Sequence, residues 1–267
     1  MSRLFDLMHK PEPPTVCDEI HDVPVEYAEI LPEARLVFHT DSRSPAADRY
    51  RFLRMRLREL AASAKLKTLL VTSPLPHDGK STVCLNLATA LAEGGNKSVL
   101  LMEADLHQPV LSAKLRLKTW PGLADCLEGK IDLTLGIRRV DPLNWYLLPA
   151  GGSRGNASEL LQTAALTGVM NKVVPQFDWI IVDSPPALAL SDATSLTRHA
   201  DATLLVVRAD QTAREAVDET VAIIGRKRLI GVVLNGVNSF DGSYSKYYKS
   251  YARYYSHNAP QKADKSS

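Results

Sequence analysis

The chain has 267 residues, 45% of them hydrophobic, which is enough to bury one sizeable core. Its formal net charge of +2 gives no overall basic character, so we expect no nucleic-acid partner. The three cysteines and seven histidines are scattered, and no apolar run reaches the ~20 residues of a membrane helix. We therefore expect a soluble cytoplasmic protein.

The N-terminal part of the chain is acidic. Residues 12–33 contain seven acidic residues, no Lys or Arg, and several prolines, without a sustained hydrophobic period. This composition predicts that residues 1–43 are largely disordered or loosely docked. The pattern then changes, because Tyr50, Leu53 and Leu57 recur at helical spacing between arginines. We expect an Arg-rich helix over residues 44–62 at the start of a folded domain.

Beyond this helix, apolar runs alternate with helical stretches. The predicted strands are residues 67–72, 98–103, 145–149, 179–182, 203–207 and 230–234. The predicted helices are residues 80–93, 158–174 and 213–226. Continuous apolar strands separated by helices predict an α/β fold with a doubly wound, mostly parallel sheet over residues 44–238. Ligands of such sheets bind beyond the carboxyl ends of the strands, and residues 239–267 are expected to be a mobile tail.

The segment VTSPLPHDGKSTVCLN, residues 71–86, joins a predicted strand to a predicted helix. A glycine-containing loop followed by Gly-Lys-Ser-Thr is typical of a phosphate-binding P-loop, whose backbone amides point at phosphate oxygens. Lys80 would contact the β- and γ-phosphates, and the Ser81 hydroxyl would bind Mg²⁺. Pro74 stands where the general pattern has its first glycine. The residues predicted to bind the nucleotide here are Pro76, His77, Asp78, Gly79, Lys80, Ser81 and Thr82.

Three carboxylates follow two other predicted strands. Glu103 and Asp105 come after the second strand, and Asp183 comes after the fourth. At an arbitrary strand end, a turn or helix-capping role would be the ordinary interpretation. Because these side chains converge on the edge that carries Lys80, we predict a catalytic site. Asp183 is the Walker B candidate, and Glu103 and Asp105 would position Mg²⁺ or accept a proton from an attacking hydroxyl.

Six of the nine tyrosines lie in one segment near the C-terminus, SYSKYYKSYARYY. It could be a helix that docks on the core, a stacking platform for single-stranded nucleic acid, or a set of phosphorylation sites. No Leu, Ile, Val or Phe follows Phe240, which disfavours a packed helix, and nothing else indicates base recognition. We therefore predict phosphoacceptors of the domain itself at Tyr244, Tyr247, Tyr248, Tyr251, Tyr254 and Tyr255.

Together these segments resemble the bacterial tyrosine kinases (BY-kinases) of capsule and exopolysaccharide synthesis. The P-loop is similar to the Walker A motif of that family, which also lacks the first glycine. VLLMEADLHQP resembles its second Walker motif, A′, and WIIVDSPPALALSDA resembles its Walker B strand and the loop after it. DRYRFLR resembles the Glu-x-x-Arg-x-x-Arg element through which family members form rings. PGLADCLEG, NASELL, VVRADQTAREAV and GVVLNGVN match further family segments.

The resemblance implies a P-loop NTPase fold of the deviant Walker A type, shared with partition and cell-division-placement ATPases. It implies ATP and Mg²⁺, with the metal held by Ser81, Asp105 and Asp183 and the adenine contacted by Asn235. A tail tyrosine of a neighbouring subunit would attack the γ-phosphate. The chain would form a homo-oligomeric ring through Asp48, Arg51 and Arg54.

The resemblance also implies partners. Many family members are fused to a membrane protein that activates them, and this chain resembles the stand-alone form. We expect a separate transmembrane polysaccharide co-polymerase as activator, a cognate tyrosine phosphatase, and a cytoplasmic location at the inner face of the plasma membrane through the partner.

The sequence departs from the family pattern at three positions. Glu103 replaces the first Asp of the A′ motif, His107 replaces its usual Arg, and Asp48 replaces the Glu of the ring element. Two alternatives stay open, a P-loop ATPase switch and, in view of Glu103 and His107, a nucleotide-binding scaffold, neither of which phosphorylates tyrosine. The ATPase switches usually carry a second lysine early in the loop, and residues 73–76 contain none.

Overall fold

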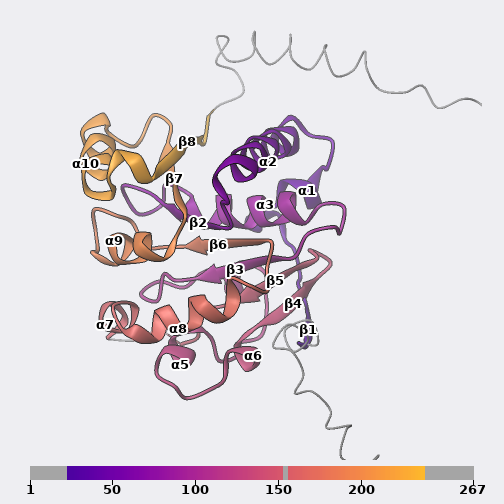
Figure 1. Cartoon of the computed structure of the whole chain (residues 1–267). Coiled ribbons are helices and arrows are strands. Elements are labelled where there is room, and N and C mark those ends of the chain that lie inside the picture. The colour runs from indigo at the N-terminus through magenta and orange to yellow at the C-terminus, as the bar shows by residue number, and fades with distance from the viewer. Residues whose placement is uncertain (1–22, 153–155, 238–267) are drawn as a thin grey trace, which may run out of the picture.

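The computed structural model describes residues 23–152 and 156–237, which build one mixed sheet with helices on both faces (Figure 1). The strands are β1 (Val25–Tyr27), β2 (Thr68–Thr72), β3 (Val99–Glu103), β4 (Arg138–Asp141), β5 (Trp145–Leu148), β6 (Trp179–Asp183), β7 (Ala202–Arg208) and β8 (Leu229–Asn235). Their order across the sheet is β1-β4-β5-β3-β6-β2-β7-β8. Neighbouring strands are parallel except β4 and β5. The predicted α/β fold with a mostly parallel sheet is confirmed.

The helices connect these strands. They are α1 (Val37–Thr40), α2 (Pro45–Ala64), α3 (Lys80–Ala92), α4 (Leu111–Lys114), α5 (Leu123–Leu127), α6 (Leu133–Gly136), α7 (Ala157–Leu161), α8 (Ala164–Val173), α9 (Asp192–Leu196) and α10 (Arg214–Ile224). Three short 3₁₀ turns are η1 (Pro32–Ala34), η2 (Thr197–His199) and η3 (Arg226–Arg228). Within the described ranges no helix combines the length and the apolar character needed to cross a membrane.

The central strands β2, β3 and β6 are buried on both faces, and their side chains alternate between two cores. Leu69 and Val71 of β2 pack into one core with the apolar residues of α3, whereas Leu70 packs into the other with α5, α7 and α8. Figure 1 shows α2 and α3 on one side of the sheet and α5, α7 and α8 on the other. This is the doubly wound arrangement expected from the continuous apolar strands.

One predicted helix is divided. Residues 158–174 were expected to form a single helix, but the chain forms α7 and α8 with a break at Thr163. Thr163 has an extended ψ of 159°, and its hydroxyl donates to the carbonyl of Leu160 at 2.7 Å. The hydroxyl therefore competes with the helical backbone bonds at this point.

The acidic N-terminal segment is folded where the structure describes it, so the prediction of a disordered or loosely docked segment was wrong for residues 23–43. Strand β1 pairs with β4 at the edge of the sheet, and Ala34 and Leu36 are 2% and 1% exposed. The backbone amide of Val37 donates to Oδ1 of Asn86 on α3 at 2.8 Å. We call residues 23–41 the N-terminal arm; residues 1–22 lie outside the described residues.

Strand pairing sets the position of the predicted site. Asp183 is in register with Val71 of β2 on one side and with Glu103 of β3 on the other. The carboxyl ends of these three strands therefore meet where the P-loop leaves β2. The predicted residues of three separate motifs share one edge of the sheet for this reason.

Candidate functional site

The P-loop between β2 and α3 begins its helix at Gly79. This residue has a φ of +98°, and a Cβ atom there would overlap Nδ2 of Asn235. Asn235 at the end of β8 donates from Nδ2 to the carbonyl of Asp78 at 2.9 Å. A glycine is needed here both for the left-handed backbone and for the close approach of Asn235.

Asp78 braces the loop. Its Oδ2 accepts a hydrogen bond from the amide of Leu75 at 3.0 Å, and its Oδ1 accepts one from the Thr212 hydroxyl at 2.7 Å. With an exposure of 3%, Asp78 does not line the cavity beside the loop. We therefore interpret the predicted role of Asp78 in nucleotide binding as indirect: it stabilises the conformation of the P-loop and does not face the cavity.

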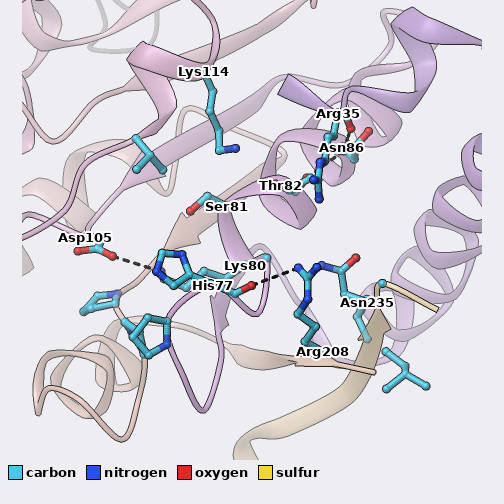
Figure 2. Close-up of a pocket in the computed structure, with 18 of the residues that line it drawn as sticks. Arg35, His77, Lys80, Ser81, Thr82, Asn86, Asp105, Lys114, Arg208 and Asn235 are labelled. Atoms are coloured by element: carbon cyan, nitrogen blue, oxygen red, sulfur yellow. Dashed lines mark hydrogen bonds and ion pairs between the residues drawn. The ribbon is translucent and has the colours of Figure 1, made fainter. Parts of the chain in front are cut away.

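A cavity of about 860 Å³ opens beside the P-loop (Figure 2). Its wall includes the predicted nucleotide-binding residues Pro76, His77, Gly79, Lys80, Ser81, Thr82 and Asn235. Arg208 at the end of β7 contributes to the same wall and donates to the carbonyl of His77 at 3.4 Å. The volume and the row of P-loop groups suit a nucleoside triphosphate.

Lys80 and Asp105 form an ion pair inside this cavity. Nζ of Lys80 lies 3.3 Å from Oδ2 of Asp105, and both side chains are largely buried. Oδ1 of Asp105 accepts a hydrogen bond from the amide of Gln108 at 3.0 Å, which fixes the carboxylate. The structure thus brings together the predicted phosphate-binding lysine and one of the predicted metal ligands.

Asp183 is fully buried below the cavity. The Ser81 hydroxyl and the Cys84 thiol lie beside its carboxylate, but neither oxygen accepts a hydrogen bond of normal geometry from the described residues. Burial raises the pKa of Asp183 to about 7, although the nearby Lys80 ammonium opposes this shift. A buried carboxylate with two unused oxygens is costly unless a cation or a proton accompanies it.

These residues fit Mg²⁺. The Ser81 hydroxyl and the carboxylates of Asp105 and Asp183 are hard oxygen ligands within one small region. Among the described residues there is no cluster of three or more His, Cys, Asp or Glu side chains that could hold a metal ion alone. Mg²⁺ in nucleotide sites is commonly held by one or two carboxylates together with waters and the phosphates. The few oxygen donors present here are therefore enough for such a site.

Glu103 lies opposite Asp183 at the predicted edge of the sheet, but its carboxylate binds backbone amides. Its Oε1 accepts hydrogen bonds from the amides of Val110 and Leu111 at 2.6 and 2.7 Å, and its Oε2 accepts one from Ala150 at 3.1 Å. Burial raises its pKa, and the backbone amides oppose that shift. Glu103 does not line the nucleotide-sized cavity. The geometry therefore favours a role in holding the loop after β3 over the predicted role in binding metal or accepting a proton.

His107, which stands where the resembling family usually has Arg, faces the loop after β6. Its Nε2 lies 2.9 Å from Oδ2 of Asp192, a fully buried residue at the start of α9. His107 also lines the cavity. It therefore links the A′ segment to the segment after the Walker B strand.

The residues predicted to form ring contacts pair within the chain. Arg51 and Arg54 of α2 both bind the carboxylate of Glu93, at 2.7 and 2.6 Å. Arg51 also lies 3.1 Å from Asp48, whose side chain is 57% exposed. A ring contact through these arginines would have to share or exchange the Glu93 carboxylate. The six predicted phosphoacceptor tyrosines lie outside the described residues.

Several residues of the cavity were not predicted. Arg35 comes from the N-terminal arm, Asn86 from α3, Lys114 from the end of α4 and Arg208 from β7. Arg35 and Lys114 belong to no motif described above, and Asn86 and Arg208 lie in matched segments without having been assigned to the site. The sequence did contain a signal for Asn86, because it is a polar residue in the middle of an apolar helical stretch. A buried polar side chain needs hydrogen-bond partners.

Comparison with known proteins gives the family. The model of the AAA domain family (AAA_31) matches residues 78–229. Tyrosine-protein kinase YwqD of Bacillus subtilis is 28% identical over 206 residues, which are 76% of this chain and 86% of that protein. Tyrosine-protein kinase CpsD of Streptococcus pneumoniae is 32% identical over 195 residues, which are 68% and 85% of the two chains. Against the longer tyrosine-protein kinase ptk of Acinetobacter johnsonii, the match is 30% identical and covers 72% of this chain but only 26% of that protein.

Solved structures agree with the sequence matches. The kinase domain of the Escherichia coli tyrosine kinase ETK superposes with a TM-score of 0.73 at 25% identity, covering 86% of this chain and 96% of that domain. The septum site-determining protein MinD of Pyrococcus horikoshii, solved with Mg-ADP, shares the fold with a TM-score of 0.56 at 24% identity, covering 65% and 72% of the two chains. The site geometry, the family model and these matches lead to one conclusion: the chain is a P-loop protein of the AAA domain family and belongs to the bacterial tyrosine kinases.

Proposed function

We propose that this chain transfers the γ-phosphoryl group of Mg-ATP to tyrosines of the 244–255 segment in a neighbouring copy. The observation that carries the proposal is a cavity of nucleotide size that is lined by Lys80 and Asp105, with the buried carboxylate of Asp183 beside them. Family membership supports the reaction class. The choice of the tail as acceptor is supported by its six clustered tyrosines.

The proposed binding step uses the P-loop. Lys80 would leave Asp105 and contact the β- and γ-phosphates, and the amides at the start of α3 would bind the phosphate oxygens. Ser81, Asp105 and Asp183 would hold Mg²⁺, which when bound neutralises charge on the phosphates. Asn235 and the end of β8 would lie against the adenine.

The proposed transfer step depends mainly on positioning. The tyrosine oxygen attacks the γ-phosphorus in line, the bond from this phosphorus to the β–γ bridging oxygen breaks, and ADP leaves. The hydroxyl proton passes to a carboxylate of the site. Asp105 is the candidate, because its Oδ2 loses its ion pair once Lys80 binds phosphate.

We further propose the assembly and partners of this kinase. Copies would form a ring through Asp48, Arg51 and Arg54, so that one tail reaches the next site. Each phosphotyrosine adds about two negative charges, so modified tails repel one another and favour disassembly. A transmembrane polysaccharide co-polymerase would activate the kinase at the inner face of the plasma membrane, and a tyrosine phosphatase would reset it. Names such as succinoglycan biosynthesis transport protein, given to a relative in Rhizobium meliloti, support this setting.

Incubation with Mg-ATP followed by mass analysis of tryptic peptides covering Tyr244–Tyr255 tests the proposal. We expect added mass in steps of one phosphate, and loss of at least about a hundredfold in rate for Lys80→Met. The matched control is Lys118→Met, an exposed lysine away from the cavity. ATP loss without added mass would instead indicate an ATPase switch, and neither change would indicate a nucleotide-binding scaffold.

A further inference from the structure

Two cations line the nucleotide-sized cavity from segments outside the P-loop. Arg35 belongs to the N-terminal arm and Lys114 ends α4, yet both share the cavity wall with Lys80, Ser81 and Thr82. In Figure 2 the side chain of Lys114 extends into the cavity in the direction of Ser81, and Arg35 lies beside Thr82 and Asn86. Neither cation is part of a P-loop or Walker motif.

The fold holds Arg35 in place by its backbone. Its neighbours Ala34 and Leu36 are buried in the core, so the exposed Arg35 side chain must point outward between them. Asn86, itself fully buried, donates from Nδ2 to the carbonyl of Arg35 at 2.9 Å and accepts from the amide of Val37 at 2.8 Å. The arm cannot shift along α3 without breaking these bonds and exposing apolar surface.

The position of Lys114 is fixed in a comparable way. The buried carboxylate of Glu103 binds the amides of Val110 and Leu111, the residues at the start of α4. The following residue, Leu115, accepts a hydrogen bond from the arm at Glu29, at 3.1 Å. The two segments that carry Arg35 and Lys114 are therefore bonded to each other as well as to the core.

The Arg35 and Lys114 side chains form no ion pair within the described part of the chain. Neither side chain has a hydrogen-bond partner there, whereas Lys80 pairs with Asp105 and Arg208 with the carbonyl of His77. The pKa of Lys114 is lowered, first by burial and then by the charge of Arg35. Of the carboxylates nearby, Asp105 is paired with Lys80, and neither Glu33 nor Asp183 forms an ion pair with these two cations. Two cations that line one cavity without an ion pair are suited to bind a polyanion.

We propose that Arg35 and Lys114 form a second cationic wall that binds the polyphosphate of the nucleotide together with the P-loop. The inference rests on nucleotide binding in the proposed function and adds two residues to that site. Lys114 extends in the direction of Ser81, the predicted Mg²⁺ ligand, so it would contact the terminal phosphates. Arg35 lies nearer Thr82 and Asn86 and would contact a phosphate closer to the nucleoside.

The test measures nucleotide binding by the full chain. Arg35→Gln, Lys114→Gln and the double variant are titrated by calorimetry with Mg-ATP, Mg-ADP, AMP and inorganic triphosphate. The matched controls are Arg43→Gln and Lys118→Gln, exposed cations of the same two regions that do not line the cavity. Thermal unfolding without ligand checks that each variant is folded.

We expect each single variant to raise the Kd for Mg-ATP about tenfold, because a hydrogen bond to a charged group is worth about 1.5 kcal/mol or more. Triphosphate should lose affinity in parallel, AMP should lose less than about threefold, and Lys114→Arg should restore most of the binding. The controls should differ from the parent chain by less than about twofold.

Unchanged Mg-ATP affinity in the folded double variant would overturn the inference, as would an equal loss for AMP and ATP. The inference would also be overturned if the double variant kept its nucleotide affinity but lost binding to a phosphotyrosine peptide. The two cations would then bind the phosphorylated acceptor segment. The proposed function fails separately, if the parent chain binds ATP in the predicted manner but adds no phosphate to tyrosine.

Discussion

Nζ of Lys80 lies 3.3 Å from Oδ2 of Asp105, so the lysine expected to bind phosphate is paired with a carboxylate of its own chain. Both side chains are mostly buried, which makes the pair stronger than an exposed one. A nucleotide must therefore compete with Asp105 for Lys80. The pair defines a resting state of the site, and its breakage would release Asp105 at the moment the phosphates bind.

The variant Asp105→Asn separates binding from transfer. Removing the competing carboxylate should leave Lys80 free, so the affinity for ADP without Mg²⁺ should rise about threefold to tenfold. Phosphoryl transfer to tyrosine should fall by about a hundredfold or more, because the proposed proton acceptor and proposed metal ligand is lost. Calorimetry and single-turnover phosphorylation measure the two effects. Weaker ADP binding would show that the ion pair does not restrain Lys80.

Asp183 gives the ligand-free protein a pH-dependent stability. Its pKa is raised to about 7 by burial, above the value in the unfolded chain, so the native state binds the extra proton. Stability from this group is therefore present at low pH and falls as the pH rises from about 4 to about 7. We expect Asp183→Asn to melt at a higher temperature than the parent chain near pH 8 in EDTA, and the difference to shrink near pH 5.

Melting in the presence of Mg²⁺ and nucleotide provides the control for this prediction. Mg²⁺ with nucleotide should raise the melting temperature of the parent chain near pH 8 more than that of Asp183→Asn, since the variant lacks the anionic oxygen. An unchanged difference between the two proteins from pH 5 to pH 8 would contradict the burial of an ionisable Asp183 without a partner.

Glu103 should act on the fold more than on the chemistry. Glu103→Gln replaces one accepting oxygen by an NH₂ group that faces backbone amides, which should lower the free energy of unfolding by about 2–3 kcal/mol. Hydrogen exchange at Val110 and Leu111 should increase. Chemical denaturation gives the first quantity, with Glu219→Gln, a substitution of an exposed acidic residue on α10, as the control. A stable variant that loses only phosphoryl transfer would restore the catalytic role first predicted for Glu103.

The ion pairs of Arg51 and Arg54 with Glu93 should compete with contacts between copies of the chain. Glu93→Gln weakens both pairs and frees the arginines for a neighbouring copy, so we expect a larger oligomer fraction by sedimentation velocity at low salt. Arg51→Ala and Arg54→Ala should reduce that fraction. Stability should change by less than about 1 kcal/mol, because these pairs are partly exposed. Identical sedimentation of all three variants and the parent chain would exclude ring contacts through this patch.

The parts of the site that the sequence predicted share a physical reason. The P-loop, Asp105 and Asp183 each follow an apolar strand directly, and parallel strands bring their carboxyl ends to one edge whatever the strand order is. The six predicted strands and the α/β class follow from the same continuous apolar runs. The local sequence pattern was sufficient to predict these residues, because each strand end and the loop after it are adjacent in sequence.

The N-terminal arm, the role of Glu103 and the cations at Arg35 and Lys114 were decided by the tertiary structure. The arm carries an acidic, proline-containing sequence, and it is ordered because β4 offers it an edge and Asn86 offers it two hydrogen bonds. A carboxylate after a strand looks the same in sequence whether it faces a cavity, like Asp105, or three backbone amides, like Glu103. Contacts between residues that are distant in sequence have no local signature, because only the packed sheet brings them together.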